Sequence, residues 1–228
     1  MAGSSLFDRL KAAAGETWRA YVGHDFVKAL GAGDLPASAF RYYLVQDYLF
    51  LRHLCRAYGL AVYKAAALDE IRQASEALQA IAAVEIAHHV GYCVRHGIDA
   101  AALDAAEEDL ATTAYARYLL DVGSAGDLLD LHAALAPCVA GYGEIGRRLN
   151  DDPGTRRDGN PYREWIEMYA GEAYQGVAAA ERAMLDRLGA ARGGEGRLDA
   201  LAAIFREATR LEAGFWDMGM KAARGGGR

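Results

Sequence analysis

Two carboxylates in this sequence stand in surroundings where a charge is unusual. Asp47 lies in the middle of FRYYLVQDYLFL, residues 40–51, among aromatic and aliphatic side chains that indicate a buried helix. Because an unpaired buried charge is very costly, Asp47 either has a structural partner or faces a pocket that binds a ligand. Glu212, in TRLEAGFWDMGMKA, shares a helix face with apolar residues. It is either a boundary carboxylate or a buried group whose raised pKa would suit a general acid.

Cys138 is the third candidate, because it directly follows Pro137 in LHAALAPCVAGYGEIG. Proline inside a helix removes one hydrogen bond and kinks the helix, and such a defect often marks a place where a pocket is shaped. The alternative is a structural cysteine that fills space. A reactive thiolate needs a cation, a helix N-terminus or a base nearby. His132 lies on another part of the helix surface, so an activating group would come from another helix, whereas Tyr142 at i+4 shares the face of Cys138.

The segment EIAHH, residues 85–89, carries one copy of the Glu-x-x-His spacing, in Glu85 and His88. Helical di-iron sites use two copies of this motif and further carboxylates. The sequence contains no second copy, so we predict no metal site and expect no cofactor. The separation of Glu85 and His89 by one helical turn favours a salt bridge or hydrogen bond between them.

Tyrosines are abundant, and most of the thirteen lie in apolar helical contexts. Buried tyrosines use the hydroxyl to reach a polar partner, so most of them are expected in the core. A subset could stack on a flat aromatic ligand. Together with a cysteine beside a helical proline and two carboxylates in aromatic surroundings, they predict a pocket for a flat heterocycle with hydrogen-bonding edges.

The elements that must position these side chains are helices. Frequent alanine and only four prolines favour helix, and no stretch shows strand alternation between turns. About seven helices without a sheet indicate an all-α bundle, with one helix interrupted by Pro137. Short connections indicate a single domain over residues 1–228, with a disordered tail over about 223–228. The predicted helices cover residues 4–22, 36–66, 68–96, 104–122, 127–149, 161–189 and 197–222.

Charge and composition restrict the function further. The formal net charge is −6, the isoelectric point is near 5.5 and no basic stripe is present, so nucleic acid is not expected as a partner. No stretch looks apolar for long enough to cross a bilayer, and the N-terminus lacks the apolar core of a signal peptide. Three widely spaced cysteines indicate neither a disulfide framework nor a zinc site. We therefore expect a cytoplasmic protein without membrane contact.

Four segments, in this order and at these separations, resemble the TenA family of thiaminase II proteins: FRYYLVQDYLFL, LAPCVAGYGEIG, WIEMYAGEAY and LEAGFWDMG. The resemblance covers about residues 5–220. It implies an all-helical, heme-oxygenase-like fold, a homotetramer and a small-molecule pyrimidine substrate. The implied enzyme is a hydrolase of thiamine salvage, an aminopyrimidine aminohydrolase that cleaves aminomethyl pyrimidine to hydroxymethyl pyrimidine and ammonia. Thiamine, cleaved to pyrimidine and thiazole, is a second implied substrate.

The resemblance also implies roles for single residues. Cys138 matches the nucleophile of the family, and Glu212 matches the acid at a ring nitrogen of the pyrimidine. Asp47 matches the residue that binds the amino group and ring edge. Tyr169 matches a tyrosine that lines the pocket near the cysteine, and Tyr142 matches another family tyrosine that we assign to substrate binding.

Two positions depart from the family pattern. Phe50 stands where the best-known members have tyrosine, so a hydroxyl near the cysteine or the substrate is missing. In the middle helix, TTAYARYLL, the direct spacing lands on Arg117. We assign Tyr115 to the substrate-binding residues and keep Tyr118 as the alternative. Both departures bear on the substrate and the rate more than on the fold.

Two other functions are compatible with this reading. Glu85 and His88, joined by further carboxylates, would serve a non-heme metal-dependent oxidase on the same fold. A protein whose position 50 and middle helix have diverged would bind the pyrimidine without turning it over.

Overall fold

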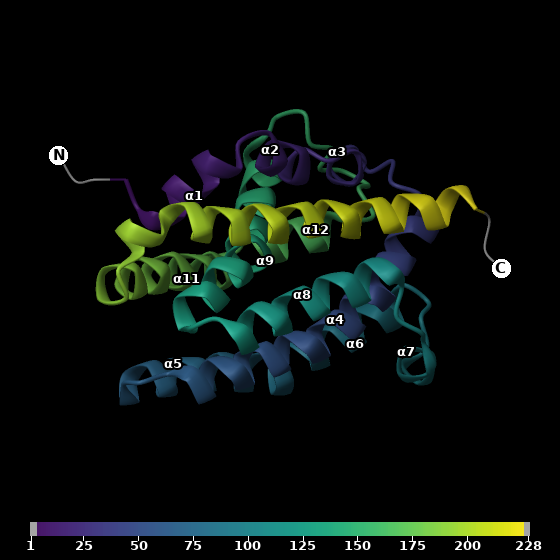
Figure 1. Ribbon diagram of the computed structural model, residues 1–228. Helices are drawn as coiled ribbons and strands as arrows, with labels where there is room; N and C mark the ends of the chain where they lie inside the picture. The colour runs from purple at the N-terminus through teal and green to yellow at the C-terminus, as the bar shows by residue number, and fades with distance from the viewer. Residues whose placement is uncertain (1–3, 226–228) are drawn as a thin grey trace. The chain divides into compact units, whose positions relative to one another are not determined.

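The computed structural model describes residues 4–225, which form helices joined by short connections, with no strand among them (Figure 1). The predicted all-α class is therefore confirmed. A π-helical segment, Ala80–Glu85, joins α5 to α6, and a 3-10 turn, Gly194–Arg197, precedes α12. The α-helices are α1 Leu6–Ala14, α2 Glu16–Val22, α3 Asp25–Ala32, α4 Ala37–Lys64, α5 Leu68–Gln79, α6 Ile86–Arg95, α7 Ala100–Ala105, α8 Leu110–Ala125, α9 Leu128–Asp151, α10 Arg163–Ala170, α11 Glu172–Ala191 and α12 Leu198–Arg224.

Twelve α-helices lie within residues 4–225, so the predicted number of about seven is wrong. Gly15, with φ of 54°, splits the first predicted helix into α1 and α2, because few other residues adopt this conformation. Gly171 is extended, with φ of −65° and ψ of 152°, and separates α10 from α11. The short helices α3 and α7 lie in segments that the sequence pattern reads as connections, because one or two turns show no clear helical period.

Two further details of the helix prediction need correction. α9 runs without interruption through Pro137, although proline removes one of its hydrogen bonds. The turn before this proline, residues 133–136, is fully buried, and this packing keeps the helix intact. α12 extends to Arg224, so the first residues of the predicted tail are helical. Residues 226–228 of that tail lie outside the described part of the chain.

Contacts between residues divide the chain into two compact units. The first unit contains the residues up to Leu35 together with His132–Trp216, and the second contains Pro36–Leu131 together with the residues from Asp217 onwards. The first unit thus holds α1, α2, α3, α10, α11 and most of α9 and α12, and the second holds α4 to α8. Each unit has its own buried side chains and is described by itself.

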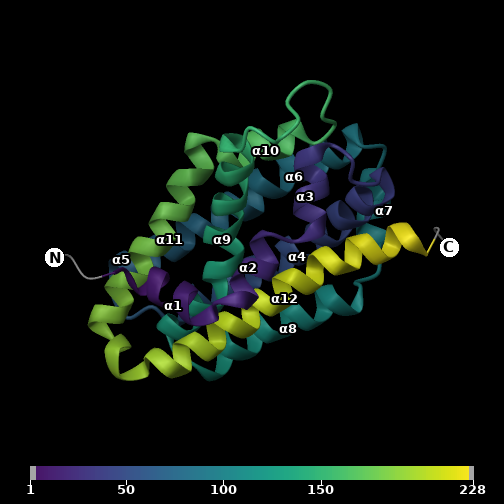
Figure 2. The same ribbon diagram turned by 90° about the horizontal axis from the view of Figure 1, so that it is seen from above.

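An aromatic core holds the first unit together. Trp18 of α2 stacks on Phe205 of α12, with 5.4 Å between ring centroids and 24° between planes. Phe7 of α1 meets both rings edge-on, and α1 also packs against α11 (Figure 2). This packing fixes α12 around Phe205, and Glu212 lies two turns further along the same helix.

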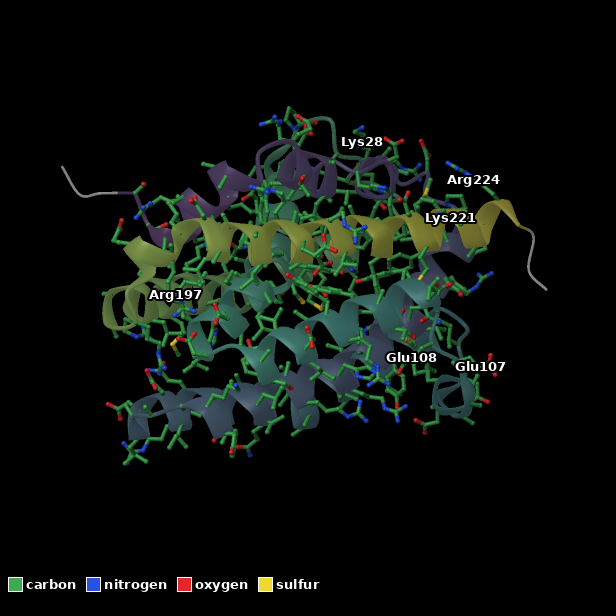
Figure 3. All side chains as sticks on the ribbon, in the orientation of Figure 1. Lys28, Glu107, Glu108, Arg197, Lys221 and Arg224 are labelled. Atoms are coloured by element: carbon green, nitrogen blue, oxygen red, sulfur yellow. The ribbon has the colours of Figure 1, made fainter. Side chains whose placement is uncertain are left out.

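The second unit is built on α4, which packs against α5, α6 and α8 (Figure 1). Gln46 of α4 fixes the start of α8, because its side-chain oxygen accepts from the Asp109 amide at 2.9 Å and the Thr112 hydroxyl at 2.7 Å. Its side-chain nitrogen donates to the Glu107 carbonyl at 2.9 Å. Glu107 and the adjacent Glu108 mark this connection at the edge of the unit (Figure 3).

The helical segment Leu68–Arg95 is 28 residues long and is apolar enough, by length and composition alone, to cross a membrane. The prediction that no stretch meets this criterion is therefore wrong. Only 17% of its most apolar window is buried, and Val84 and Val94 are 53% and 54% exposed.

Candidate active site

Asp47 is brought into the second unit by the aromatic face of α4, and it is only 8% exposed. Its Oδ2 lies 3.5 Å from Nδ1 of His89 on α6. Nε2 of His89 lies 2.8 Å from the carbonyl oxygen of Leu44, one turn before Asp47. The buried carboxylate therefore has a structural partner, whose orientation is set by the backbone of the same helix.

The surroundings of Asp47 act on its pKa in opposite directions. Burial is the largest effect and raises the pKa, because it disfavours the charged form. The charge of His89 and a hydrogen bond from the Tyr43 hydroxyl lower the pKa, because both stabilise the carboxylate. Burial, followed by the charge of Asp47, raises the pKa of Glu85 to about 7. We call Tyr43, Asp47, Glu85 and His89 the Asp47 cluster.

Phe50 and Tyr115 form a second feature of this unit. Their rings stack with 4.7 Å between centroids and 17° between planes, and both side chains are almost fully buried. Arg117, on which the direct spacing falls, is exposed, and Tyr118 is half-buried. Tyr115 is thus the middle-helix residue that lies beside Phe50, the position where a hydroxyl is missing.

In the first unit, Cys138 lies on α9 as a free cysteine that is partly exposed. The adjacent Pro137 offers its carbonyl oxygen to the hydroxyl of Tyr21, which donates at 3.2 Å. Gly141 makes this approach possible, because a Cβ atom at this position would lie 2.6 Å from Cε1 of Tyr21. α2 and α9 therefore meet closely next to the cysteine.

The pKa of Tyr21 depends on the charged groups around its hydroxyl. Its pKa lies well above the ordinary value, first because the hydroxyl is fully buried and then because of the negative charges of Glu212 and Cys138. Tyr174 and Tyr169 add to the effect. Glu212 is only 2% exposed, so it is a buried carboxyl group and not a boundary residue. We call Tyr21, Cys138, Glu212, Tyr169 and Tyr174 the Cys138 cluster.

Aromatic side chains surround the Cys138 cluster within the first unit. Tyr142 lies with its ring centroid 5.0 Å from that of Tyr169 and 5.3 Å from that of Trp216. Trp165 lies 4.5 Å from Tyr169. α10, which carries Trp165 and Tyr169, comes close to α9 at Gly146, where a Cβ atom would lie 2.5 Å from the Tyr169 carbonyl carbon. These rings offer flat apolar surfaces of the kind that a heterocycle stacks on.

Sequence reasoning selected Asp47, Cys138 and Glu212 for their types, and overlooked the residues that hold them. The predicted contact between Glu85 and His89 is wrong, because both ring nitrogens of His89 are directed at α4. The apolar period of its helix predicts Tyr21 as an ordinary core residue. Its hydrogen bond to Pro137, next to Cys138, depends on the packing of α2 on α9 and is not predictable from the sequence.

A metal site was the alternative reading of Glu85 and His88. Within residues 4–225, no group of three or more His, Cys, Asp or Glu side chains is arranged to hold a metal ion. His88 is exposed, whereas Glu85 is half-buried and interacts electrostatically with Asp47. The Glu-x-x-His spacing therefore lacks the further ligands that a di-iron site requires.

Comparison with known proteins gives a consistent result. The sequence model of the TENA/THI-4/PQQC family matches residues 11–222. An aminopyrimidine aminohydrolase of Halalkalibacterium halodurans is 39% identical over 202 residues, which are 88% of this chain and 89% of that protein.

Solved structures show the same relationship at the level of the fold. The crystal structure of a TenA family transcription regulator from a Silicibacter species is similar with a TM-score of 0.89 and 43% identity, and covers 95% of this chain and 97% of that chain. A domain of unknown function with a heme oxygenase-like fold from Shewanella denitrificans has a TM-score of 0.75 at 15% identity, over 94% of this chain and 92% of that chain. This last likeness concerns the fold alone.

Proposed function

The chain belongs to the TENA/THI-4/PQQC family, and from this premise we propose that it is a hydrolase of thiamine salvage. Its reaction converts aminomethyl pyrimidine and water to hydroxymethyl pyrimidine and ammonia. The observation that carries the proposal is the 39% identity to an aminopyrimidine aminohydrolase over nearly the whole of both chains. The family match spans both compact units, which supports a single family domain over residues 1–228.

The proposed chemistry combines a nucleophile with a general acid. Glu212 protonates a ring nitrogen and makes the pyrimidine more electron-poor. The Cys138 thiolate adds to the ring, and the electron pair moves toward the exocyclic methylene and expels ammonia from the protonated aminomethyl group. Water then adds to the methylene and releases a proton to solvent, the thiolate leaves the ring, and the ring-nitrogen proton returns to Glu212. With thiamine as substrate, the thiazole would leave in place of ammonia.

The arrangement around Tyr21 supports these two roles. Cys138 and Glu212 both act electrostatically on the same buried hydroxyl of the first unit, which supports a shared role. Glu212 is buried, with 2% of its surface exposed, so bulk water does not compete for a proton at this position. Tyr142 and Tyr169 of the same unit would stack on the flat ring.

Asp47 is proposed to bind the amino edge of the pyrimidine. A carboxylate has about four lone-pair sites, and the contacts with His89 and Tyr43 leave some of them for a ligand. A hydrogen bond between the substrate amino group and a charged acceptor is stronger than one between neutral groups, and provides specificity.

Assembly and location complete the proposal. We infer a homotetramer that works in the cytoplasm, without nucleic-acid or membrane partners and without a cofactor. The apolar surface of Leu68–Arg95 supports this inference, because a second copy of the chain would cover the exposed valines. Sedimentation of the purified protein tests it, and a monomer that binds vesicles would contradict it.

Ammonia release from aminomethyl pyrimidine tests the proposed reaction. We expect Cys138→Ser to abolish turnover while circular dichroism stays unchanged, because the hydroxyl is a much poorer nucleophile than a thiolate. Cys55→Ser is the matched control and should retain turnover. Undiminished turnover by Cys138→Ser would refute the nucleophile assignment. Tight binding by the wild-type protein without turnover would instead support a pyrimidine-binding protein that is catalytically silent.

A further inference from the structure

Glu85 is a carboxylate that the proposed reaction does not use. It is the last residue of the π-helical segment Ala80–Glu85, which interrupts the helical segment Leu68–Arg95. Single π-helical turns inside α-helices are rare and frequently occur at functional sites. The neighbours Val84 and Ala87 are exposed, whereas Glu85 is more shielded and interacts with side chains of α4.

The groups around Glu85 come from two helices. Asp47 and Cys55 of α4 both interact with it electrostatically. His89 and Cys93 of α6 approach the same Asp47. Burial, followed by the charge of Asp47, raises the pKa of Glu85 to about 7, so both protonation states are present near neutral pH.

His89 fixes the position of the Asp47 carboxylate. A carbonyl oxygen only accepts hydrogen bonds, so Nε2 of His89 carries a hydrogen toward Leu44. Nδ1 of the same ring lies 3.5 Å from Oδ2 of Asp47. His89 therefore holds Asp47 in place, and ionisation of Glu85 adds one negative charge to the Asp47 cluster.

We propose that Glu85 is a specificity-determining residue that binds a cationic substituent on the pyrimidine whose amino edge is held by Asp47. This inference rests on the proposed function. The amino group and the methylene substituent occupy neighbouring ring atoms, so a second carboxylate close to Asp47 meets the ammonium of aminomethyl pyrimidine or the thiazolium of thiamine. The hydroxymethyl product carries no charge at this position. Glu85 therefore favours the substrates over the product.

Binding measurements with two ligands test the role of Glu85. Thiamine is a permanent cation, hydroxymethyl pyrimidine is neutral, and Cys138→Ser protein serves as the background in which neither is turned over. We expect the ratio of their affinities, measured by calorimetry, to shift about tenfold toward thiamine between about pH 6 and about pH 8, as Glu85 ionises. The double variant that carries Glu85→Gln in addition to Cys138→Ser should not show this pH-dependent change in the affinity ratio. Glu76→Gln, an exposed glutamate of α5, is the matched control and should retain it.

The outcomes separate this inference from the proposed function. Suppose that both ligands bind but the affinity ratio still shifts with pH in the Glu85→Gln protein, or does not shift in the Cys138→Ser background protein. Then Glu85 does not bind the cationic substituent, and the proposed function stands. If neither ligand binds the wild-type protein, both proposals are wrong. Urea unfolding of each variant shows that the chain is folded, so that a lost shift is not attributed to misfolding.

Discussion

Replacing Glu85 by glutamine tests the electrostatics of the Asp47 cluster without any ligand. Burial and then the charge of Asp47 raise the pKa of Glu85 from 4.5 to about 7 on folding. A raised pKa means that the stabilising contribution is fully present below about pH 4.5 and is lost as the pH rises through about 7. The difference between these values, at about 1.4 kcal/mol per pH unit, amounts to about 3 kcal/mol.

Glutamine has the shape of the protonated acid and does not ionise, so the variant escapes this loss. We expect Glu85→Gln to be about 3 kcal/mol more stable than the wild-type protein at about pH 8, and within about 1 kcal/mol of it at about pH 5. Urea unfolding followed by circular dichroism at both pH values measures the difference. Because the two proteins share nearly all other titrating groups, most other pH effects cancel.

Glu76→Gln is the control for this measurement, and its stability should match the wild-type protein at both pH values, because Glu76 is exposed. The reasoning would be refuted if Glu85→Gln differed from the wild-type protein by the same amount at both pH values. It would also be refuted if the variant were the less stable protein at about pH 8. Either result would mean that Glu85 is an ordinary solvated carboxylate.

Two further substitutions test the surroundings of the clusters. Phe50→Tyr should leave turnover of aminomethyl pyrimidine unchanged or raise it, because the substitution restores a hydroxyl beside Tyr115. Release of ammonia measures the turnover. A loss of activity would show that position 50 does not lie beside the substrate. Gly141→Ala would put a Cβ atom 2.6 Å from the Tyr21 ring, so we expect a loss of about 1–3 kcal/mol in urea unfolding. Gly176→Ala, with no atom within 4 Å of the added Cβ, should instead be neutral or stabilising, and equal stability of the two alanine variants would contradict the close contact.

Long helices were predictable because many turns repeat the same apolar period. α4, α9 and α12 follow from this pattern to within a few residues. The break at Gly15 was not predictable, because glycine also occurs inside helices and only the observed φ of 54° distinguishes the two cases. Continuity of α9 through Pro137 depends on burial of the preceding turn, which is a tertiary effect.

Residue type identified part of the candidate site, because a carboxylate in apolar surroundings is conspicuous in a sequence. Asp47 was found in this way. Its partner His89 was not, because the contact joins two helices and has no fixed separation in the sequence. The pattern EIAHH drew attention to Glu85 for its spacing to His88 and His89, whereas its pKa of about 7 comes from burial and from Asp47 across the helix contact. The separation of two residues in the sequence predicts whether they are neighbours on the same helix, but it does not predict contacts with another helix.

Asp47 first suggests two explanations, a structural partner or a ligand pocket, and the geometry makes these compatible. His89 and Tyr43 stabilise the carboxylate before any ligand arrives, so a charged acceptor is held ready and needs no reorganisation on binding. His89 in turn is held by the Leu44 carbonyl, one turn along the same helix as Asp47, so acceptor and partner cannot easily drift apart. A cation that approaches the cluster gains a second attraction when Glu85 ionises. On the proposed function, the neutral product lacks this second attraction and is expected to leave more readily than the substrate.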